Sequence, residues 1–581
     1  MQTTKVTIDQ QAERDKYTEL IINSPAQKRI IVAGPGTGKT TTFQKVLAQT
    51  DSKNNLVLTF INRLVNDLNG RLNQYANVST MHKFCAGIFH KQFPEWHLVG
   101  SLGKIIAEDT KVCLGIYDEV FHKLDESSSM FKLYLKRGSY YKSVGFNDSV
   151  YRVLKKGLAA PDIIAEYDNI LIDEFQDFSA LEAAFIKLLE AHGKILIVGD
   201  DDQAIYLKRF DLGRNLRSMY RSGDYSLFEL PYCSRCPKVI VESVNDIVNS
   251  AVNKGYLKDR ISKQFVAYEP EKEEVNRNYP KLLVLEMVSD KAAALFVDRY
   301  VCHILKNELE RYQQSQSTDP LVLIIGKPQC LNSVKKKLPT IAEYIEPDNK
   351  STELTDICRA YDILMKDDSS NMGWRLLMLY DKIPSPKKHK EIISKSMDGS
   401  PLVSFLPGEY KQRHMAIVKL IYMIVNGLEN ETTSLEQQLE ELVGLDMKQC
   451  IIKYFTEGGI DGSVDSSSTR YPIQMTGFQG SKGLSADYVF IFGLNNGELP
   501  RDPQCIRDSE ICELIVGLTR TKKECYVMPI CHVGERRCQK SVLLSWVDSK
   551  RVSKCQLNIK DVRDILKKNG ISDKGDIFEK P

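Results

Sequence analysis

Short runs of apolar, often β-branched residues recur along the chain, and several end directly at glycines or carboxylates. Such runs, bounded by turn-forming residues, are typical of buried strands in a parallel sheet. After the first run a glycine cluster is followed by a helical pattern, and this succession predicts an α/β fold. The runs that support the prediction span residues 28–33, 169–172, 194–199, 321–325 and 526–529.

The glycine cluster after the first run reads Ala33-Gly-Pro-Gly-Thr-Gly-Lys39-Thr40. Strand, glycine loop and helix form the setting of a phosphate-binding loop, in which backbone N–H groups and the helix N-terminus surround phosphate oxygens. Lys39 would neutralise the terminal phosphates, and the Thr40 hydroxyl could ligate Mg²⁺. The alternative is a glycine loop that merely turns the chain, and a Gly-Lys-Thr sequence directly after a strand argues against it.

Two carboxylates, Asp173 and Glu174, follow the apolar run at 169–172. The carboxyl end of a parallel strand is where such sheets bind their ligands. Asp173 is predicted to hold Mg²⁺ through water, and Glu174 to accept a proton from the attacking water. Further on, Gln203 could contact a γ-phosphate, but chemistry alone does not decide between this role and a local hydrogen bond.

Composition adds limits to these expectations. At about 150 residues per domain, 581 residues correspond to roughly three to four compact units. The formal charge of +3 is nearly balanced, so any surface for nucleic acid must be a local basic groove. We expect a cytoplasmic protein without membrane spans, because no apolar run approaches about 18 residues. The 14 cysteines indicate reduced thiols, and Cys233-x-x-Cys236 lacks the second pair that a zinc site needs.

The segments described above, with others in a fixed order, resemble the motifs of superfamily 1 DNA helicases of the UvrD/Rep/PcrA type. The resemblance extends along nearly the whole chain. Its first and second motifs are the glycine loop and Asp173-Glu-Phe-Gln-Asp177, and its sixth contains Thr519-Arg520. The remaining matching segments are 56–63, 78–84, 199–206, 230–235, 359–375 and 475–484.

This resemblance implies two RecA-like P-loop domains, each a parallel sheet flanked by helices, with helical insertions and with ATP between the domains. It assigns catalytic roles to Glu174, Gln203, Arg235 and Arg520. Arg235 would reach the γ-phosphate from the second domain, and Arg520 would be the arginine finger, which is worth orders of magnitude in rate. ATP and Mg²⁺ are the expected cofactors, with Thr40 and Asp173 at the metal. The predicted cofactor contacts are Gln11, Gly34, Gly36, Thr37, Gly38, Lys39, Thr40, Thr41, Asp173 and Gly483.

The DNA-facing segments depart from the family at several positions. Lys208 stands where the family has an aromatic residue that stacks on a base. Either Phe210 or Tyr206 stacks on the base instead, or the protein binds DNA more through its phosphates than through its bases. Gln479 and Ser485 replace a histidine and a glutamate. Gln10 and Gln11 are the candidate adenine readers, with Gln11 slightly better placed, and a solvated glutamine in an N-terminal helix is the equal alternative. The predicted nucleic-acid contacts are Thr59, Phe60, Asn62, Arg63, Thr80, His82, Tyr206, Lys208, Phe210, Thr476 and Lys482.

The resemblance also divides the chain into lobes and insertions. The first insertion contains Lys136, Arg137, Tyr140 and Tyr141, a basic and aromatic mixture that suits either a single-strand platform or a solvated helix with core aromatics. The expected units are a first lobe at 1–84 and 166–222 with a helical insertion at 85–165, a second lobe at 223–345 and 466–548 with a reduced helical insertion at 346–465, and a charged tail at 549–581.

The leading hypothesis is an ATP-dependent DNA helicase or translocase that moves 3′ to 5′ on single-stranded DNA, in repair, recombination or phage defence. Its alternative is an ATP-gated nucleic-acid-binding subunit of a larger complex, which does not unwind alone. An RNA-directed motor is a third possibility, because no residue is a demonstrable reader of the 2′-hydroxyl. The expected partners are single-stranded or 3′-tailed DNA and, as a further candidate, a nuclease or other repair or defence protein.

Overall fold

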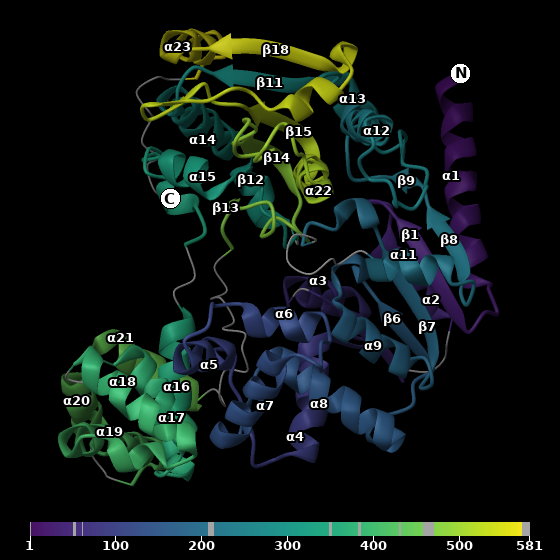
Figure 1. Cartoon of the computed structure of the whole chain (residues 1–581). Helices are drawn as coiled ribbons and strands as arrows, with labels where there is room; N and C mark the ends of the chain where they lie inside the picture. Colours follow the sequence, from purple (N-terminus) through teal and green to yellow (C-terminus); the bar gives the residue numbers. More distant parts are fainter. Residues whose placement is uncertain are drawn as a thin grey trace.

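Two parallel sheets with helices packed on their faces form the frame of the molecule (Figure 1). Nearly continuous apolar runs suit such strands because both faces of the sheet are buried. None of the helices in the described ranges combines the length and apolar character that crossing a bilayer requires. The computed structural model describes residues 2–49, 54–60, 62–206, 214–315, 317–347, 351–381, 385–428, 432–456 and 470–571.

The first sheet lies in the first lobe and places three strand ends side by side. Its six strands, in spatial order, are β3 (Asn77–Thr80), β2 (Asn55–Thr59), β6 (Asn169–Ile172), β7 (Lys194–Gly199), β1 (Lys28–Ala33) and β8 (Ser226–Leu230). All are parallel, so the carboxyl ends of β6, β7 and β1 form one neighbouring set. The lobe's helices are α1 (Gln2–Ile22), α2 (Lys39–Ala48), α3 (Asn62–Leu72), α9 (Ala180–Leu189) and α11 (Arg214–Arg221).

Strand β8 corrects the expected boundary between the lobes. The sequence predicted that the second lobe begins at residue 223, but β8 pairs in parallel with β1, with Ile31 opposite Phe228. Residues 226–230 therefore belong to the first sheet. The residue pattern of a short segment can predict that it forms a strand. The strand with which it pairs is decided by packing between segments distant in the chain.

The second sheet repeats the architecture, with strands in the order β13 (Ile473–Thr476), β12 (Val322–Ile325), β14 (Ala486–Phe492), β15 (Thr521–Met528), β11 (Leu282–Met287) and β18 (Val552–Leu557). Small elements accompany it: the parallel pair β9 (Tyr232–Cys233) and β10 (Val266–Ala267), and the hairpin β16 (His532–Val533) and β17 (Arg536–Arg537). The helices of this lobe are α12 (Lys238–Asn253), α13 (Glu273–Asn278), α14 (Asp290–Gln314), α15 (Pro328–Lys335), α22 (Asp508–Leu518) and α23 (Ile559–Lys568).

The expected charged tail also needs correction. Residues 552–557 form the edge strand β18, paired with β11 from Leu282 opposite Val552 to Met287 opposite Leu557. The apolar side of α23 packs on the second lobe through Val562 and Leu566, at the top of Figure 1. The middle of β18 is exposed and polar because it lies at the sheet edge, which is why its sequence resembles a solvated tail. Residues 572–581 lie outside the described part of the chain.

Two helical insertions lie beside each other along the bottom of Figure 1, the first at the lower centre and the second at the lower left. The first contains α4 (Met81–Gln92), α5 (Leu102–Thr110), α6 (Ile116–His122), α7 (Ser129–Tyr141) and α8 (Phe146–Ala159), with the short parallel strands β4 (His97–Leu98) and β5 (Ser143–Val144). The second contains α16 (Ser351–Lys366), α17 (Asn371–Tyr380), α18 (Pro386–Lys395), α19 (Gly408–Asn426), α20 (Thr432–Val443) and α21 (Leu445–Thr456).

A buried ion cluster joins the two insertions. Asp109 of α5 accepts hydrogen bonds from Arg137 of α7 at 2.7 Å and from Arg375 of α17 at 3.0 Å. Arg137 also donates to the carbonyl of Ser396, and Tyr141 donates to Asp109. Arg137 and Tyr141 are thus buried within this contact, so they do not form the basic and aromatic platform that was one of the two interpretations of their sequence.

Replacing Asp109 with asparagine should lower the free energy of unfolding by about 3 kcal/mol, because it leaves two buried guanidinium groups without a full counter-charge. Glu108→Gln is the matched control: Glu108 also pairs with Arg375, at 3.0 Å, but its side chain is 41% exposed. The control should cost about 0–1 kcal/mol. Urea unfolding monitored by tryptophan fluorescence measures both, since Trp374 is buried in α17. Equal losses in the two variants would contradict a structural role for the buried cluster.

Candidate active site

The turn after β1 wraps around the N-terminus of α2. Gly36 (φ 71°) and Gly38 (φ 91°) adopt the left-handed conformation, which glycine enters without steric cost. Thr37 donates a hydrogen bond to the Gly34 carbonyl at 2.9 Å, which closes the loop. Lys39, Thr40 and Thr41 are the first residues of α2. The loop therefore directs backbone N–H groups and the positive end of a helix toward one point, an arrangement suited to a phosphate.

Lys39 faces a carboxylate delivered by the neighbouring strand β6. Its Nζ lies 2.5 Å from Oε1 of Glu174. Burial acts to raise the pKa of Glu174, but the ammonium groups of Lys39 and Lys482 outweigh it and hold this pKa well below its ordinary value. Burial acts to lower the pKa of Lys39, and Glu174 and Asp173 more than offset it. The two side chains are therefore fully charged at neutral pH.

Asp173 precedes Glu174 and lies in a more strongly desolvated position. Burial raises the pKa of Asp173 to about 6 against the opposing effect of Lys39, so the charge of this carboxylate is only partly compensated by the protein. One of its oxygens accepts a hydrogen bond from the N–H of Glu174 at 3.0 Å. A carboxylate of this kind and the Thr40 hydroxyl are oxygen donors that fit a hard divalent cation such as Mg²⁺.

Lys482 follows β13 in the second lobe and enters this carboxylate group from across the cleft. It forms an ion pair with Asp177, lies 3.8 Å from Glu174 and donates to the carbonyl of Gln203 at 3.0 Å. Burial raises the pKa of Asp177 to about 7, opposed by Lys482. The sequence predicted that Lys482 contacts nucleic acid, but the structure buries it among first-lobe carboxylates. Gly483, with φ 80°, follows it in the chain.

Arg520 and Gln203 form the second contact across the cleft. Gln203 lies in the turn after β7, and its Oε1 accepts a hydrogen bond from Arg520 Nη2 at 2.9 Å. Arg520 also donates to the carbonyls of Leu484 and Val516, which fixes its guanidinium. Burial, and then the charge of Arg235, lower the pKa of Arg520 to about 10. The guanidinium is therefore buried and still charged at neutral pH.

Arg235 lies directly against the glycine loop. The N–H of Ser234 donates to the Gly36 carbonyl at 3.0 Å. A Cβ added to Gly36 would come within 2.4 Å of Cβ of Arg235, so only glycine allows this approach. Cys233 and Cys236 are buried, and among the described residues neither lies in a group of three or more ligand side chains that could hold a metal ion. Gly36 is thus required both for the turn and for contact between the lobes.

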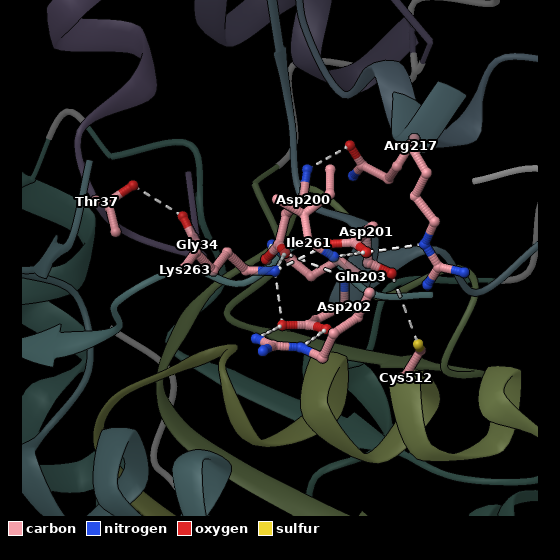
Figure 2. Close-up of polar contacts among 12 residues, drawn as sticks. Gly34, Thr37, Asp200, Asp201, Asp202, Gln203, Arg217, Ile261, Lys263 and Cys512 are labelled. Atoms are coloured by element: carbon pink, nitrogen blue, oxygen red, sulfur yellow. Dashed lines mark hydrogen bonds and ion pairs between the residues drawn. The ribbon is translucent and has the colours of Figure 1, made fainter. Parts of the chain in front are cut away.

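Two residues that the sequence analysis did not identify belong to the same region. Lys263 and Arg260 pair with the buried aspartates that follow β7, as Figure 2 shows for Lys263. Neither lies in a recognised motif. The available signal was the run of three aspartates at 200–202, because buried carboxylates need cationic partners. The sequence cannot say which of its 79 lysines and arginines supply them.

Gln11 lies where α1 meets the second lobe. Its amide oxygen accepts a hydrogen bond from Tyr268, and its amide nitrogen donates to Asp15 at 2.7 Å. Arg14 stands over the ring of Tyr268, 4.7 Å from the ring centroid. The amide of Gln11 is thus engaged with protein groups, and its expected contact with a base stays a prediction.

The residues expected to contact DNA divide into two groups. Phe60 and Tyr206 lie together at partly exposed positions, with ring centroids 5.6 Å apart. By contrast, Thr59 is fully buried in β2, and Thr80 is buried and caps α4 by accepting a hydrogen bond from Lys83. The expectation that these two threonine side chains face DNA is therefore corrected, because strand burial and helix capping occupy them.

The other residues expected to contact DNA lie apart from this aromatic pair or outside the described part of the structure. His82 contacts Asn147 at 3.2 Å, and Thr476 ends β13. Asn62 and Arg63 begin α3, but their side chains lie outside the described part of the structure, as do residues Lys208 and Phe210 entirely.

Comparison with known proteins finds similarity to an AAA domain and to DNA helicases. A family profile described as an AAA domain matches residues 18–209. The chain is 22% identical over 614 aligned positions to a probable DNA helicase II homolog of Mycoplasma capricolum, covering 88% of this chain and 83% of that protein. It is 23% identical over 287 positions to the ATP-dependent DNA helicase PcrA of Bacillus subtilis, covering 39% and 38%. Over 68 positions it is 44% identical to DNA helicase II of Escherichia coli, covering 11% and 9%.

Proposed function

Because the chain belongs to the UvrD/Rep/PcrA type of superfamily 1 helicases, we propose that it is a DNA helicase that hydrolyses ATP between its two lobes. One observation carries the proposal: Arg520 of the second lobe hydrogen-bonds to Gln203 of the first. A site completed by groups from both lobes responds to their relative position. Hydrolysis in such a site can therefore be coupled to movement of one lobe against the other.

The chemistry follows from the charges around the glycine loop. The loop and Lys39 bind the phosphates, Thr40 and Asp173 would hold Mg²⁺, and Glu174 accepts a proton from the attacking water. Bound Mg²⁺ supplies positive charge to the phosphate oxygens. Arg520 and Arg235 stabilise the negative charge that develops in the transition state, since both approach from the second lobe. Gln203 connects the phosphate site to Arg520 through its amide.

For the nucleic acid we propose a single strand of DNA that passes Phe60 and Tyr206. Two adjacent, partly exposed aromatic rings form a surface on which bases can stack, and stacking contributes about 1–3 kcal/mol per base. Movement from 3′ to 5′ is proposed from the family. DNA with a 3′ tail is the corresponding substrate.

The proposal is tested by ATP hydrolysis with and without single-stranded DNA, alongside strand separation on 3′-tailed and 5′-tailed duplexes. Single-stranded DNA should stimulate the wild type, and only the 3′-tailed duplex should be separated. Lys39→Ala should lower kcat by about 100-fold or more, since it removes a cation at the transferring phosphate. Lys28→Ala is the matched control, because Lys28 also lies 2.5 Å from a glutamate but at the other end of β1.

Each contrary result has a distinct meaning. Hydrolysis without any stimulation by DNA would contradict a DNA motor. Stimulation without strand separation would favour the ATP-gated subunit over the helicase. Separation of the 5′-tailed duplex alone would overturn the proposed polarity.

A further inference from the structure

Three consecutive aspartates, Asp200, Asp201 and Asp202, are buried between the lobes directly after β7. Carboxylate oxygens from the three residues lie within 4.8 Å of one another. At such distances like charges repel strongly in a desolvated environment. The fold must therefore supply positive charge at this point, and the source of that charge controls the geometry of the turn.

A single buried lysine contacts all three carboxylates. Nζ of Lys263 lies 2.8 Å from Asp200, 3.0 Å from Asp201 and 2.6 Å from Asp202, and its side chain is only 4% exposed. Figure 2 shows this ammonium group directed among the three carboxylates. Arg260 adds two hydrogen bonds to Asp202, at 2.9 and 2.8 Å. Burial acts to lower the pKa of Lys263, and the three carboxylates outweigh it and hold the pKa well above its ordinary value.

Lys263 lies in the irregular segment 254–265, which leads from α12 to β10 and which we call the strap. The strap is anchored in both lobes. Leu257 packs in the core of the second lobe, and its N–H donates to Asp508 at 3.0 Å. Ile261 packs in the core of the first lobe, and its N–H donates to Asp201 at 2.8 Å. The strap therefore carries Lys263 from one lobe into the turn of the other.

Asp200 connects Lys263 to the hydrolytic site. Its Oδ2 accepts a hydrogen bond from Nε2 of Gln203 at 2.7 Å, while Oε1 of the same amide accepts from Arg520. The N–H of Asp200 donates to Gln176 at 2.9 Å, and Gln176 donates in turn to Glu174 at 2.5 Å. An amide has one accepting and one donating end, so fixing Asp200 fixes which end of Gln203 faces Arg520.

We propose that Lys263 is a positioning residue for ATP hydrolysis: by holding Asp200 it orients Gln203 toward Arg520, and the strap thereby makes hydrolysis depend on the position of the second lobe. This inference rests on the proposed function, because the orientation of Gln203 matters only if ATP is hydrolysed in the cleft. Lys263 does not touch the phosphates and acts through Asp200. Displacement of the strap from the first lobe releases Asp200 and, with it, the amide of Gln203.

The test compares Lys263→Met, which removes the charge and keeps the length, with Lys258→Met at an exposed position of the same strap. Hydrolysis is expressed per active site, titrated with a fluorescent ADP analogue. Lys263→Met should lower kcat by about 100-fold while KM for ATP stays nearly unchanged, because the glycine loop is intact. Lys258→Met should match the wild type, and Lys263→Arg should recover part of the loss.

A double-mutant comparison of Lys263 and Gln203 distinguishes a positioning role of Lys263 from a merely structural one. If Lys263 acts through Gln203, Lys263→Met should lower kcat no further when Gln203 is already alanine. The proposal would be overturned if the loss of kcat in the double variant equals, to within about twofold, the product of the losses in the two single variants. An unchanged kcat per active site in Lys263→Met would also overturn it. A wild type without ATP hydrolysis would instead refute the proposed function.

A charge-balanced variant keeps the test decisive if Lys263→Met does not fold. Lys263→Met combined with Asp202→Asn removes one positive and one negative charge and retains the pairing of Asp201 with Arg217 at 2.9 Å. The double variant should fold, as judged by its thermal midpoint, and should show the same loss of kcat per active site. Wild-type kcat in this folded variant would overturn the proposal.

Discussion

Replacing Arg520 with alanine is expected to lower kcat for ATP hydrolysis by about 10³-fold or more, the magnitude associated with an arginine supplied to a phosphoryl-transfer site. The guanidinium is buried, and at a pKa of about 10 it keeps its charge at neutral pH. In a desolvated cleft such a charge interacts strongly with the transferring phosphate. Binding of ATP should change far less than kcat, because Lys39 and the glycine loop belong to the first lobe.

Single-turnover hydrolysis and nucleotide binding, measured on the same preparation, separate these two effects. Lys523→Ala is the control: Lys523 lies three residues further along in β15 and pairs with Glu308 and Asp487 away from the cleft. It should keep wild-type kcat. If Arg520→Ala loses nucleotide affinity and kcat in equal proportion, Arg520 serves binding and not the transition state.

Replacing Glu174 with glutamine should lower kcat by about 10²- to 10⁴-fold while ATP binding is retained or strengthened. Glutamine preserves the shape of the side chain but cannot accept the proton of the attacking water. The substitution also removes the charge that holds Lys39 at 2.5 Å, so the ammonium can turn to phosphate at lower cost. The variant should therefore accumulate with ATP bound, which rapid filtration with labelled ATP measures.

Glu190→Gln makes the same chemical change in a second lysine–glutamate pair of equal length. Glu190 lies 2.5 Å from Lys28 at the opposite end of β1, far along the strand from the glycine loop. The kcat of Glu190→Gln should remain at the wild-type level. Rapid hydrolysis by Glu174→Gln would show that another group, such as Asp173 or Asp177, acts as the base.

The two substitutions concern the two halves of one site. Glu174 and Lys39 belong to the first lobe, whereas Arg520 and Lys482 reach the same carboxylates and amide from the second. Separation of the lobes would remove Arg520 and Lys482 from the phosphate site together, and Arg235 with them. The arrangement gives a physical reason why hydrolysis and lobe movement are linked in the proposed motor.

The sequence by itself determined the local part of this site. Alternating apolar runs and glycines predicted the strand, loop and helix around Lys39, and the structure confirms β1 and α2. The position of Asp173 and Glu174 directly after an apolar run placed them at the carboxyl end of a strand, which the structure shows to be β6. These features depend on residues adjacent in the sequence, because a strand, a glycine turn and the start of a helix are each specified by a few consecutive positions.

Only the tertiary structure decided which distant groups meet. It assigned β8 and β18 to their sheets, buried Arg137 against Asp109, and brought Lys482 to the carboxylates and not to a DNA surface. It also selected Lys263 as the counter-charge of the aspartates near Gln203. A run of buried aspartates in the sequence indicates that cationic partners are needed. Which of the many lysines and arginines serve as those partners is decided by the packing of segments far apart in the chain.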